Sequence, residues 1–387
     1  MKIVFAYGVL TGGGAEKRMG DLSRWLLDNG DEAWIVASNI SDNGISMMAQ
    51  QCGFPVNRIR VMEACGNYEK HTIQVAEEVG ADIIDVQWVD CVPSYTPCAL
   101  TYTMHGRTQP VPPNAPFLGI LSVEHIVPND PLHRAAPVVR SVLNWADTEK
   151  FAYRDELPED GVCWIGRLFK AVGDDALPGN VVKVAPYYKG MIDCYGTVHA
   201  ASELDKLPPN ARWLGYVKPE EVIYNYRVVL ATAICALEAL SAGRLVIAGQ
   251  PYDGRPAWGR LVRPELLDTL ALQQFASILF PHDLADPSPE AVYAELADAL
   301  ENDFTEERRR CREYVEEYHS LQGQCAKVRA FYEEVLALRV SRPRNRSYRR
   351  RPPARSVGQT RRDRWACSSR SVTAGRSTPP ACAMTAR

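Results

Sequence analysis

The sequence predicts an α/β protein made of two doubly wound parallel sheets. The chain has 387 residues, more than one ordinary domain uses, so two domains are expected. Short apolar runs alternate with helical stretches along most of the chain, which is typical of parallel sheets. An acidic, proline-bearing stretch at 155–160 interrupts this alternation and predicts a linker between the two domains.

The first half opens with a buried strand, predicted at residues 2–7, which leads into a glycine loop and a helix at 16–29. Met19, Leu22, Trp25 and Leu26 share one face of that helix. Gly30 ends the helix, and the next strand is expected at 32–37. The same alternation predicts helices at 46–52 and 68–79, and strands at 58–62, 82–87, 100–104, 117–122 and 138–143.

The second half restarts with a strand at 162–165. Further strands are predicted at 180–184, 193–196, 212–215, 228–231, 245–248 and 277–280. Ser288 followed by Pro289 predicts a helix start with an N-cap serine. Helices at 306–318 and 325–338 follow. We therefore expect domains at 1–155 and 156–320, a helix at 321–338 that packs back on the first domain, and a disordered segment at 339–387.

Composition places the protein among soluble globular chains, with 46% hydrophobic and 24% charged residues. The sequence has no apolar stretch of transmembrane length and no signal-peptide pattern at its start. Eleven cysteines include no CxxC pair and no cluster at zinc spacing. We interpret them as reduced thiols in a cytoplasmic protein that holds no metal.

The net charge of −3 is distributed very unevenly along the chain. Residues 341–387 contain 13 arginines, no lysine and one acid, so this tail carries +12 and the rest of the chain −15. The tail lacks apolar periodicity and is predicted to be disordered. Three explanations for these arginines remain open. The tail binds an anionic membrane surface or nucleic acid, it is an ordinary solvated tail, or it results from translation of a GC-rich sequence in the wrong frame. We expect no specific nucleic-acid partner.

Glycines and one histidine follow predicted strands in the first half. Gly13 and Gly14, with Gly12 before them, let a ligand approach the backbone at a helix N-terminus, although a plain flexible turn is the alternative. The dinucleotide pattern G-x-G-x-x-G is not met, because Lys17 stands at its last glycine. His105 ends the strand at 100–104, where ligands of doubly wound sheets bind, and the alternative is a structural histidine.

The second half carries two cations and one isolated carboxylate. Gly166 and Arg167 end an apolar run, and Lys170 follows three residues later, which suits a diphosphate. Glu238 stands among alanines and leucines near a predicted helix start. A carboxylate in such surroundings either caps the helix or holds a ligand hydroxyl, and we favour the ligand.

These features together resemble the retaining GT-B glycosyltransferases of the broad family 4 group, over residues 1–338. The family's glycine turn matches GGAEK at 13–17, and its strand motifs match ADIIDVQ at 81–87 and TMH at 103–105. The interdomain motif resembles NWADTEKF at 144–151. The second-domain motifs resemble GRL with Lys170 at 166–170, and LEALSAGRLVI at 237–247.

The resemblance implies two Rossmann-like domains that face a cleft, and a metal-independent, retaining transfer of a sugar from a nucleotide-diphospho-sugar, UDP-linked or otherwise. No cofactor is implied beyond this donor substrate. Arg167 and Lys170 would bind the diphosphate, Glu238 the ribose hydroxyls, Gly13 and Gly14 the distal phosphate or the acceptor, and His105 the donor sugar. The acceptor, a glycan, a lipid or a small molecule, is not identified.

The sequence departs from the family at the sugar half of the donor site. The first glutamate of the E-x7-E motif is replaced by Leu230, and the glycine-rich donor loop before the helix at Glu238 is missing. The alternative is therefore a catalytically impaired GT-B-like protein that binds a nucleotide or a partner. No acidic pair or cofactor-lysine signature favours a GT-B epimerase or phosphorylase.

Overall fold

The computed structural model describes residues 1–62, 67–87, 92–93, 95–105, 111, 115–123, 126, 130–166, 179–197, 201–249, 259–272, 274–275 and 287–341. Met1–Arg342 forms one compact unit, and the remaining residues, Pro343–Arg387, are assigned to a second one. The predicted disordered tail lies almost wholly outside the described residues.

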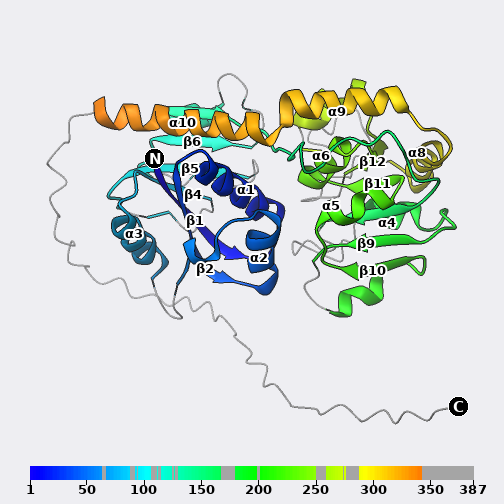
Figure 1. The fold of residues 1–387 in the computed structure, drawn as a ribbon, viewed down its shortest axis with the longest axis horizontal. Coiled ribbons are helices and arrows are strands. Elements are labelled where there is room, and N and C mark those ends of the chain that lie inside the picture. Colours follow the sequence, from blue (N-terminus) through cyan, green and yellow to red (C-terminus); the bar gives the residue numbers. More distant parts are fainter. Residues whose placement is uncertain are drawn as a thin grey trace, which may run out of the picture. The chain divides into compact units, whose positions relative to one another are not determined.

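The N-terminal half contains a seven-stranded parallel sheet in the order β3-β2-β1-β4-β5-β6-β7 (Figure 1). Its strands are β1 Lys2–Leu10, β2 Glu32–Ile40, β3 Ile59–Val61, β4 Ile83–Val86, β5 Ala99–Met104, β6 Gly119–Ser122 and β7 Val138–Ser141. Its helices are α1 Gly14–Asp28, α2 Asp42–Ser46 and α3 Tyr68–Val79, and a π-helical turn at Met47–Gln51 follows α2. The strands predicted in this half are confirmed within a few residues.

The C-terminal half contains a six-stranded sheet in the order β10-β9-β8-β11-β12-β13, parallel except for the last strand. Its strands are β8 Val162–Ile165, β9 Ile192–Tyr195, β10 Ala211–Gly215, β11 Val228–Ala231, β12 Leu245–Ala248 and β13 Arg260–Leu261. Its helices are α4 Gly179–Val184, α5 Pro219–Val222, α6 Ala233–Ser241, α7 Leu267–Leu272, α8 Pro289–Glu301 and α9 Thr305–His319. Helix α10, Leu321–Ser341, follows α9. The predicted GT-B architecture of two parallel-sheet α/β domains is confirmed.

The prediction of a strand at 180–184 is wrong, because this segment forms α4. Val181 and Val184 are both buried, three residues apart as on one face of a helix, whereas Val182 is exposed. The buried amide of Asn180 donates to the carbonyls of Ala248 and Gly249 at 3.2 and 2.9 Å, which fixes the helix against the end of β12. A short apolar run cannot distinguish the two structures by periodicity alone.

Other boundaries differ less. The predicted helix at 46–52 begins earlier, because α2 covers Asp42–Ser46, and most of the predicted range forms the π-helical turn Met47–Gln51. Ser288 caps α8 as predicted, accepting a hydrogen bond from the amide of Ala291 at 3.2 Å. The strand predicted at 277–280 lies outside the described residues.

Helix α10 packs on the N-terminal sheet although it follows the whole C-terminal half in sequence (Figure 1). Phe331 and Val335 of α10 lie directly over Gly119 at the start of β6, where an added Cβ would come within 2.6 Å of both side chains. The glycine permits this close approach. Tyr332, fully buried on the same helix, reaches the carboxylate of Asp85 on β4 at 2.7 Å.

The chain passes between the two halves at two adjacent places. Ala146 and the residues around His319 are joined by backbone hydrogen bonds, Ala146 N to His319 O and Leu321 N to Ala146 O, both at 2.9 Å. The Nδ1 atom of His319 also lies 2.7 Å from the carbonyl oxygen of Asn144. Burial lowers the pKa of His319 to about 4, so this ring is neutral at pH 7. The domain limits at 155 and 320 stay a prediction.

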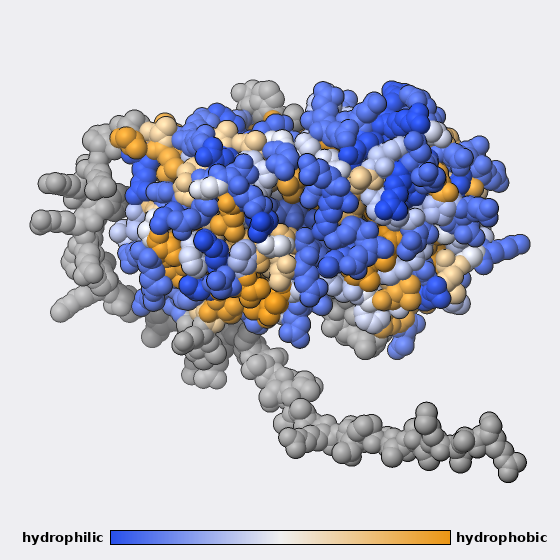
Figure 2. Space-filling model, in the orientation of Figure 1, coloured by the Kyte–Doolittle hydropathy of each residue, from blue (hydrophilic) through white to orange (hydrophobic). Residues whose placement is uncertain are grey.

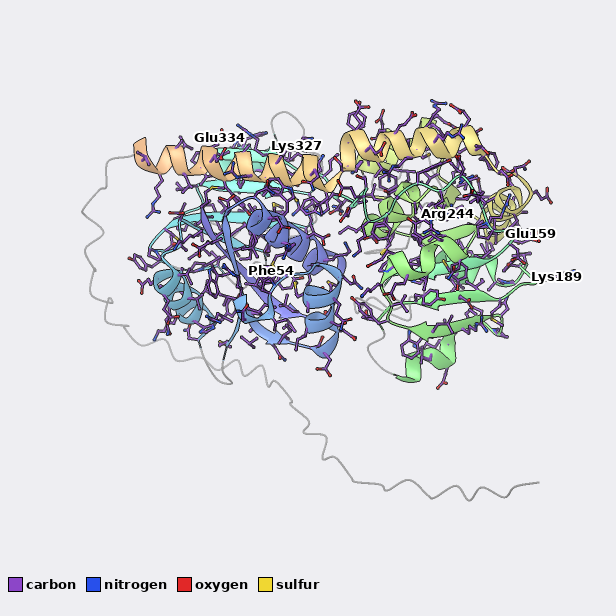
Figure 3. The ribbon with its side chains drawn as sticks, viewed as in Figure 1. Phe54, Glu159, Lys189, Arg244, Lys327 and Glu334 are labelled. Carbon is purple, nitrogen blue, oxygen red and sulfur yellow. The ribbon has the colours of Figure 1, made fainter. Side chains whose placement is uncertain are left out.

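Buried arginines hold residues 154–156, which follow the first crossing of the chain from the N-terminal to the C-terminal half. Arg308 on α9 donates to the carbonyls of Gly243, Arg154 and Asp155, and Arg244, labelled in Figure 3, donates to those of Arg154 and Glu156. Guanidinium groups have several donors in a rigid fork, which allows one side chain to satisfy several carbonyls. The segment is therefore held against α6 and α9 by side-chain hydrogen bonds.

The surface in Figure 2 is largely hydrophilic, with apolar residues grouped over part of the N-terminal half. Val9, Val56, Val61 and Ile45 are among the exposed large apolar side chains. Within the described residues, none of the helices combines the length and the apolar character needed to cross a bilayer.

Candidate functional site

Two adjoining pockets lie where the strands of both sheets end. The first pocket has about 570 Å³ of open space and is mostly apolar. It is lined by Gly12, Gly13, Gly14, Lys17, Met47, Gln51, Ile165, Gly166, Tyr195, Gly196, Thr197, Tyr216, Val217, Pro219, Ile234, Cys235 and Glu238.

The second pocket has about 830 Å³ of open space, and its lining surface is more polar than that of the first. It is lined by Gly14, Ala15, His105, Val123, Asn144, Gly166, Thr232, Ala233, Ile234, Cys235 and Gln274. The two pockets share Gly14, Gly166, Ile234 and Cys235. A ligand that occupies both therefore passes the first residues of α1 and α6.

Glu238 is the buried carboxylate of the first pocket. It lies on α6 with no exposed surface, and its Oε1 atom forms an ion pair with Lys17 Nζ at 3.0 Å. Its Oε2 atom has no hydrogen-bond partner among the described residues. Burial raises the pKa of Glu238, and the nearby Lys17 ammonium opposes that shift. An unsatisfied acceptor of this kind is costly unless a ligand supplies a donor.

Lys17 connects the two halves at the edge of this pocket. Its ammonium lies 2.8 Å from the carboxylate of Asp21, one turn later on α1, as well as 3.0 Å from Glu238. All three side chains are buried. One ammonium thus faces two carboxylates, and the group carries a net charge of about −1 when all three are ionised.

The glycine loop is closed by its own glutamate. The Glu16 carboxylate accepts hydrogen bonds from the amides of Gly13 and of Thr11, the latter at 3.0 Å. The Gly13 amide, expected to meet a phosphate or the acceptor, is directed to Glu16 in this structure. Gly14 begins α1 and lines both pockets, and the space above its Cα is open as far as Ile234, 3.9 Å from an added Cβ.

His105 follows β5 and lines the second pocket, held by a chain of hydrogen bonds. Its Nε2 lies 2.7 Å from Gln87 Oε1, and the Gln87 amide donates to Asp85 at 2.6 Å. Asp85 also accepts hydrogen bonds from Thr101, Thr103 and Tyr332. Burial, with the charge of nearby Arg18, lowers the pKa of His105 to about 3. The imidazole is therefore neutral at pH 7, and its orientation is fixed by Gln87.

Three residues beside the second pocket adopt the left-handed backbone conformation without being glycine. Ala233, Gln274 and Phe275 have φ values of 52°, 54° and 54°. The Thr232 hydroxyl and the Ala233 amide both donate to the Phe275 carbonyl, at 3.1 and 3.4 Å. Such conformations cost of order 1 kcal/mol or more each and persist where surrounding contacts hold them.

Of the predicted site residues, Gly13, Gly14, Gly166, His105 and Glu238 come together around the two pockets. Arg167 and Lys170 lie outside the described residues, directly after Gly166. Leu230, at the position of the missing glutamate, is fully buried in β11. Its side chain belongs to the hydrophobic core and not to either pocket.

Sequence reasoning assigned no role to three polar residues of the site. Lys17 and Asn144 lie within the motifs quoted above, so the sequence draws attention to both residues, but it does not show which residues they contact. Gln274 follows α7 with no recognisable pattern around it. Its amide reaches the pocket because Asn144 Nδ2 donates to Gln274 Oε1 at 3.0 Å.

Two parallel-sheet α/β domains with pockets at the strand ends have the architecture of the GT-B glycosyltransferase fold. No protein-family model matches the chain, and no curated protein matches it by sequence. Solved structures do match it. A glycosyltransferase from Rickettsia africae ESF-5 aligns with a TM-score of 0.58 at 13% identity, over 87% of this chain and 98% of that one.

Two further neighbours contain a bound nucleotide. A mutant of S. aureus TarM in complex with fondaparinux, α-GlcNAc-glycerol and UDP aligns with a TM-score of 0.58 at 11% identity, over 86% of this chain and 100% of that one. An α-glucosyltransferase in complex with UDP and a 13-mer DNA containing an HMU base aligns with a TM-score of 0.53 at 12% identity, over 86% of this chain and 99% of that one. At these identities the likeness establishes the fold.

Proposed function

We propose that this protein is a glycosyltransferase of the family 4 type, which transfers a sugar from a nucleotide-diphospho-sugar to an acceptor with retention of anomeric configuration. The observation that carries the proposal is the Glu238 carboxylate, fully buried in an apolar pocket, with Oε2 unpartnered among the described residues. This arrangement suits the paired hydroxyls of a ribose whose base lies against apolar walls.

The diphosphate would cross from the first pocket to the second at their shared lining. Gly14 and Ala233 are the first residues of α1 and α6, and Ile234 follows immediately. Helix N-termini present amides and positive partial charge, which favour an anion. Arg167 and Lys170 would add two cations next to Gly166. Charge stabilisation of the leaving diphosphate is the main chemical contribution that this arrangement offers.

The transferred sugar would lie in the second pocket with His105. The neutral imidazole of His105, oriented by Gln87, would contact a hydroxyl of this sugar. No carboxylate lines this pocket among the described residues. We therefore propose that the acceptor hydroxyl attacks from the side on which the diphosphate leaves, and that a leaving phosphate oxygen takes its proton. This step requires neither a protein nucleophile nor a metal.

The test is a titration of the full chain with UDP and with GDP by calorimetry, in wild type and in Glu238→Gln. We expect one of the diphosphates to bind, and the variant to bind it at least about tenfold more weakly, since a hydrogen bond to a charged group contributes about 1.5–3 kcal/mol. Asp298→Asn is the matched control. Asp298 lies on α8, pairs with Arg263 and lines neither pocket. Absence of binding at millimolar UDP and GDP would refute the proposal.

A second candidate function is nucleotide binding without transfer. Leu230, buried where the family has a glutamate, favours this alternative. The two candidates separate in a turnover assay with sugar-nucleotide donors, with and without EDTA. Release of diphosphate that EDTA does not affect supports the metal-independent transferase, whereas tight binding with neither transfer nor hydrolysis supports the binding protein.

A further inference from the structure

The second pocket has a neutral polar wall that is separate from the features used above. Among its described lining residues, Asn144, Thr232 and Gln274 contribute two amides and a hydroxyl, with no charge. Neutral donors and acceptors suit sugar hydroxyls better than phosphate oxygens, because amides match hydroxyls in both directions.

The two amides are fixed relative to each other. Asn144 Nδ2 donates to Gln274 Oε1 at 3.0 Å, and the Asn144 side chain is almost fully buried. The main-chain carbonyl of Asn144 lies 2.7 Å from Nδ1 of buried His319, which anchors it in the crossing between the halves. The Gln274 amide is thereby held with its oxygen toward Asn144. A preorganised amide loses little freedom when a ligand binds.

The backbone at Gln274 is held in an unfavourable conformation that carries this side chain to the pocket. Among the described non-glycine residues, left-handed φ values occur at Ala233, Gln274, Phe275 and Phe304, and two of these residues line this pocket. The Phe275 carbonyl accepts hydrogen bonds from the Thr232 hydroxyl and the Ala233 amide. These bonds connect the start of α6 to the turn at Gln274. Strain of this kind clusters at ligand sites.

The position of this wall fits the donor sugar. The second pocket joins the first through Gly14, Gly166, Ile234 and Cys235, so a group one diphosphate away from the nucleoside enters beside Ala233 and Gln274. The position of the missing family glutamate, Leu230, is buried in the sheet and cannot reach that space. The hydroxyl-binding role must therefore come from other residues of this chain.

We propose that the Gln274 amide, positioned by Asn144 and by the Thr232–Phe275 contact, binds a hydroxyl of the donor sugar and sets the sugar preference of this protein. The inference rests on the proposed function, because it assumes that a nucleoside diphosphate occupies the first pocket. It adds the specificity-determining residue for the sugar.

The experiment compares Gln274→Gly with wild type. Glycine adopts the left-handed backbone without strain, so the variant keeps the turn while it loses the side chain and its hydrogen bond with Asn144. Calorimetry measures the affinities for UDP, UDP-glucose, UDP-N-acetylglucosamine, GDP and GDP-mannose. For the sugar nucleotide that wild type prefers over its bare diphosphate, we expect Gln274→Gly to reduce that preference at least tenfold. Affinity for the bare diphosphate should change less than twofold. The melting temperature should change little, because the relief of backbone strain offsets the hydrogen bond that Asn144 loses.

Two further variants sharpen the result. Gln274→Asn keeps an amide and tolerates left-handed φ, so it should retain part of the preference. Gln74→Ala removes an exposed amide on α3, which lines neither pocket, and should leave the preference unchanged. An unchanged preference in Gln274→Gly, or an equal loss for sugar nucleotide and bare diphosphate, overturns the inference alone. If no sugar strengthens binding in wild type, the inference fails while the proposed nucleotide site stands, and if no diphosphate binds, both fail.

Discussion

Asp85 in the N-terminal half and Glu238 in the C-terminal half are both carboxylates without exposed surface, yet their surroundings differ sharply. Asp85 accepts hydrogen bonds from Gln87, Thr101, Thr103 and Tyr332. Glu238 has the Lys17 ion pair and an oxygen that no described residue satisfies. Burial raises the pKa of both groups. Hydrogen bonds counter this rise at Asp85, whereas at Glu238 the charges of Lys17 and Lys150 counter it.

The difference distinguishes a carboxylate that is fully hydrogen-bonded within the fold from one that is not. A buried acceptor with four donors ties together β4, β5 and α10, and offers nothing further to a bound molecule. A buried acceptor with an unsatisfied oxygen beside a pocket lowers the stability of the empty protein and can strengthen binding. The following variants test this contrast, from the largest expected effect to the smallest.

Asp85→Leu should lower the free energy of unfolding by about 3–5 kcal/mol, because it leaves several buried donors unpaired and removes a buried anion near Arg18. Urea unfolding at pH 7 measures this loss. Thr101→Val, which removes one of the donors, should cost only about 1 kcal/mol. A loss below about 1 kcal/mol for Asp85→Leu would mean that this carboxylate is not the structural one of the two.

Lys17→Met should lower the free energy of unfolding by about 3 kcal/mol at pH 7, because two buried carboxylates, Asp21 and Glu238, then lack a cation. Combining it with Glu238→Gln should restore about half of the loss, since one unpaired charge disappears. Urea unfolding of the four proteins gives the coupling. Additive losses would show that Lys17 and Glu238 do not interact in solution.

His105 should remain neutral well below pH 6, since burial lowers its pKa to about 3. Its contribution to stability is present above the ordinary pKa of about 6.5 and declines as the pH falls from there toward 3, because the unfolded chain then binds a proton that the folded chain rejects. Nitrogen chemical shifts of the imidazole across pH 3–8 measure the titration. A midpoint near 6.5 would contradict the buried position beside Gln87.

Glu238→Gln should change the free energy of unfolding of the nucleotide-free protein by less than about 1 kcal/mol at pH 7, because Asp21 still pairs with Lys17. The pKa of Glu238 is raised in the folded state, so its ionisation costs stability as the pH rises above the ordinary carboxyl value. The variant should therefore show a flatter pH dependence than wild type above about pH 4.5. A large loss of stability would make Glu238 a structural residue like Asp85.

Much of the fold followed from the sequence because the strands are buried on both faces. Val228–Ala231 and Leu245–Ala248 are apolar throughout and bounded by polar residues or glycine, so their limits were visible. The segment at Asn180 was misassigned because its apolar residues fit either period, and the contact of Asn180 with β12 that decides the matter is tertiary. Local pattern carries no information about such a partner.

The residues of the candidate site were likewise predictable only in part. Glu238 and His105 were predictable because each is conspicuous in its own segment, one a charge among apolar residues and the other at the end of a strand. The Lys17–Glu238 pair and the Asn144–Gln274 pair each join residues far apart in sequence, and neither residue of a pair reveals the other. The left-handed turn at Gln274 lacks the glycine or asparagine that would have indicated it.

Helix α10 has a consequence for biosynthesis. The N-terminal sheet is complete in sequence by Ser141, but the helix that covers β6 at Gly119 and donates Tyr332 to Asp85 begins only at Leu321. A ribosome adds about 5–20 residues per second. The apolar surface under α10 therefore remains uncovered for roughly ten seconds or longer while the C-terminal half is made, and a nascent chain that stops before Leu321 should be a strong chaperone substrate.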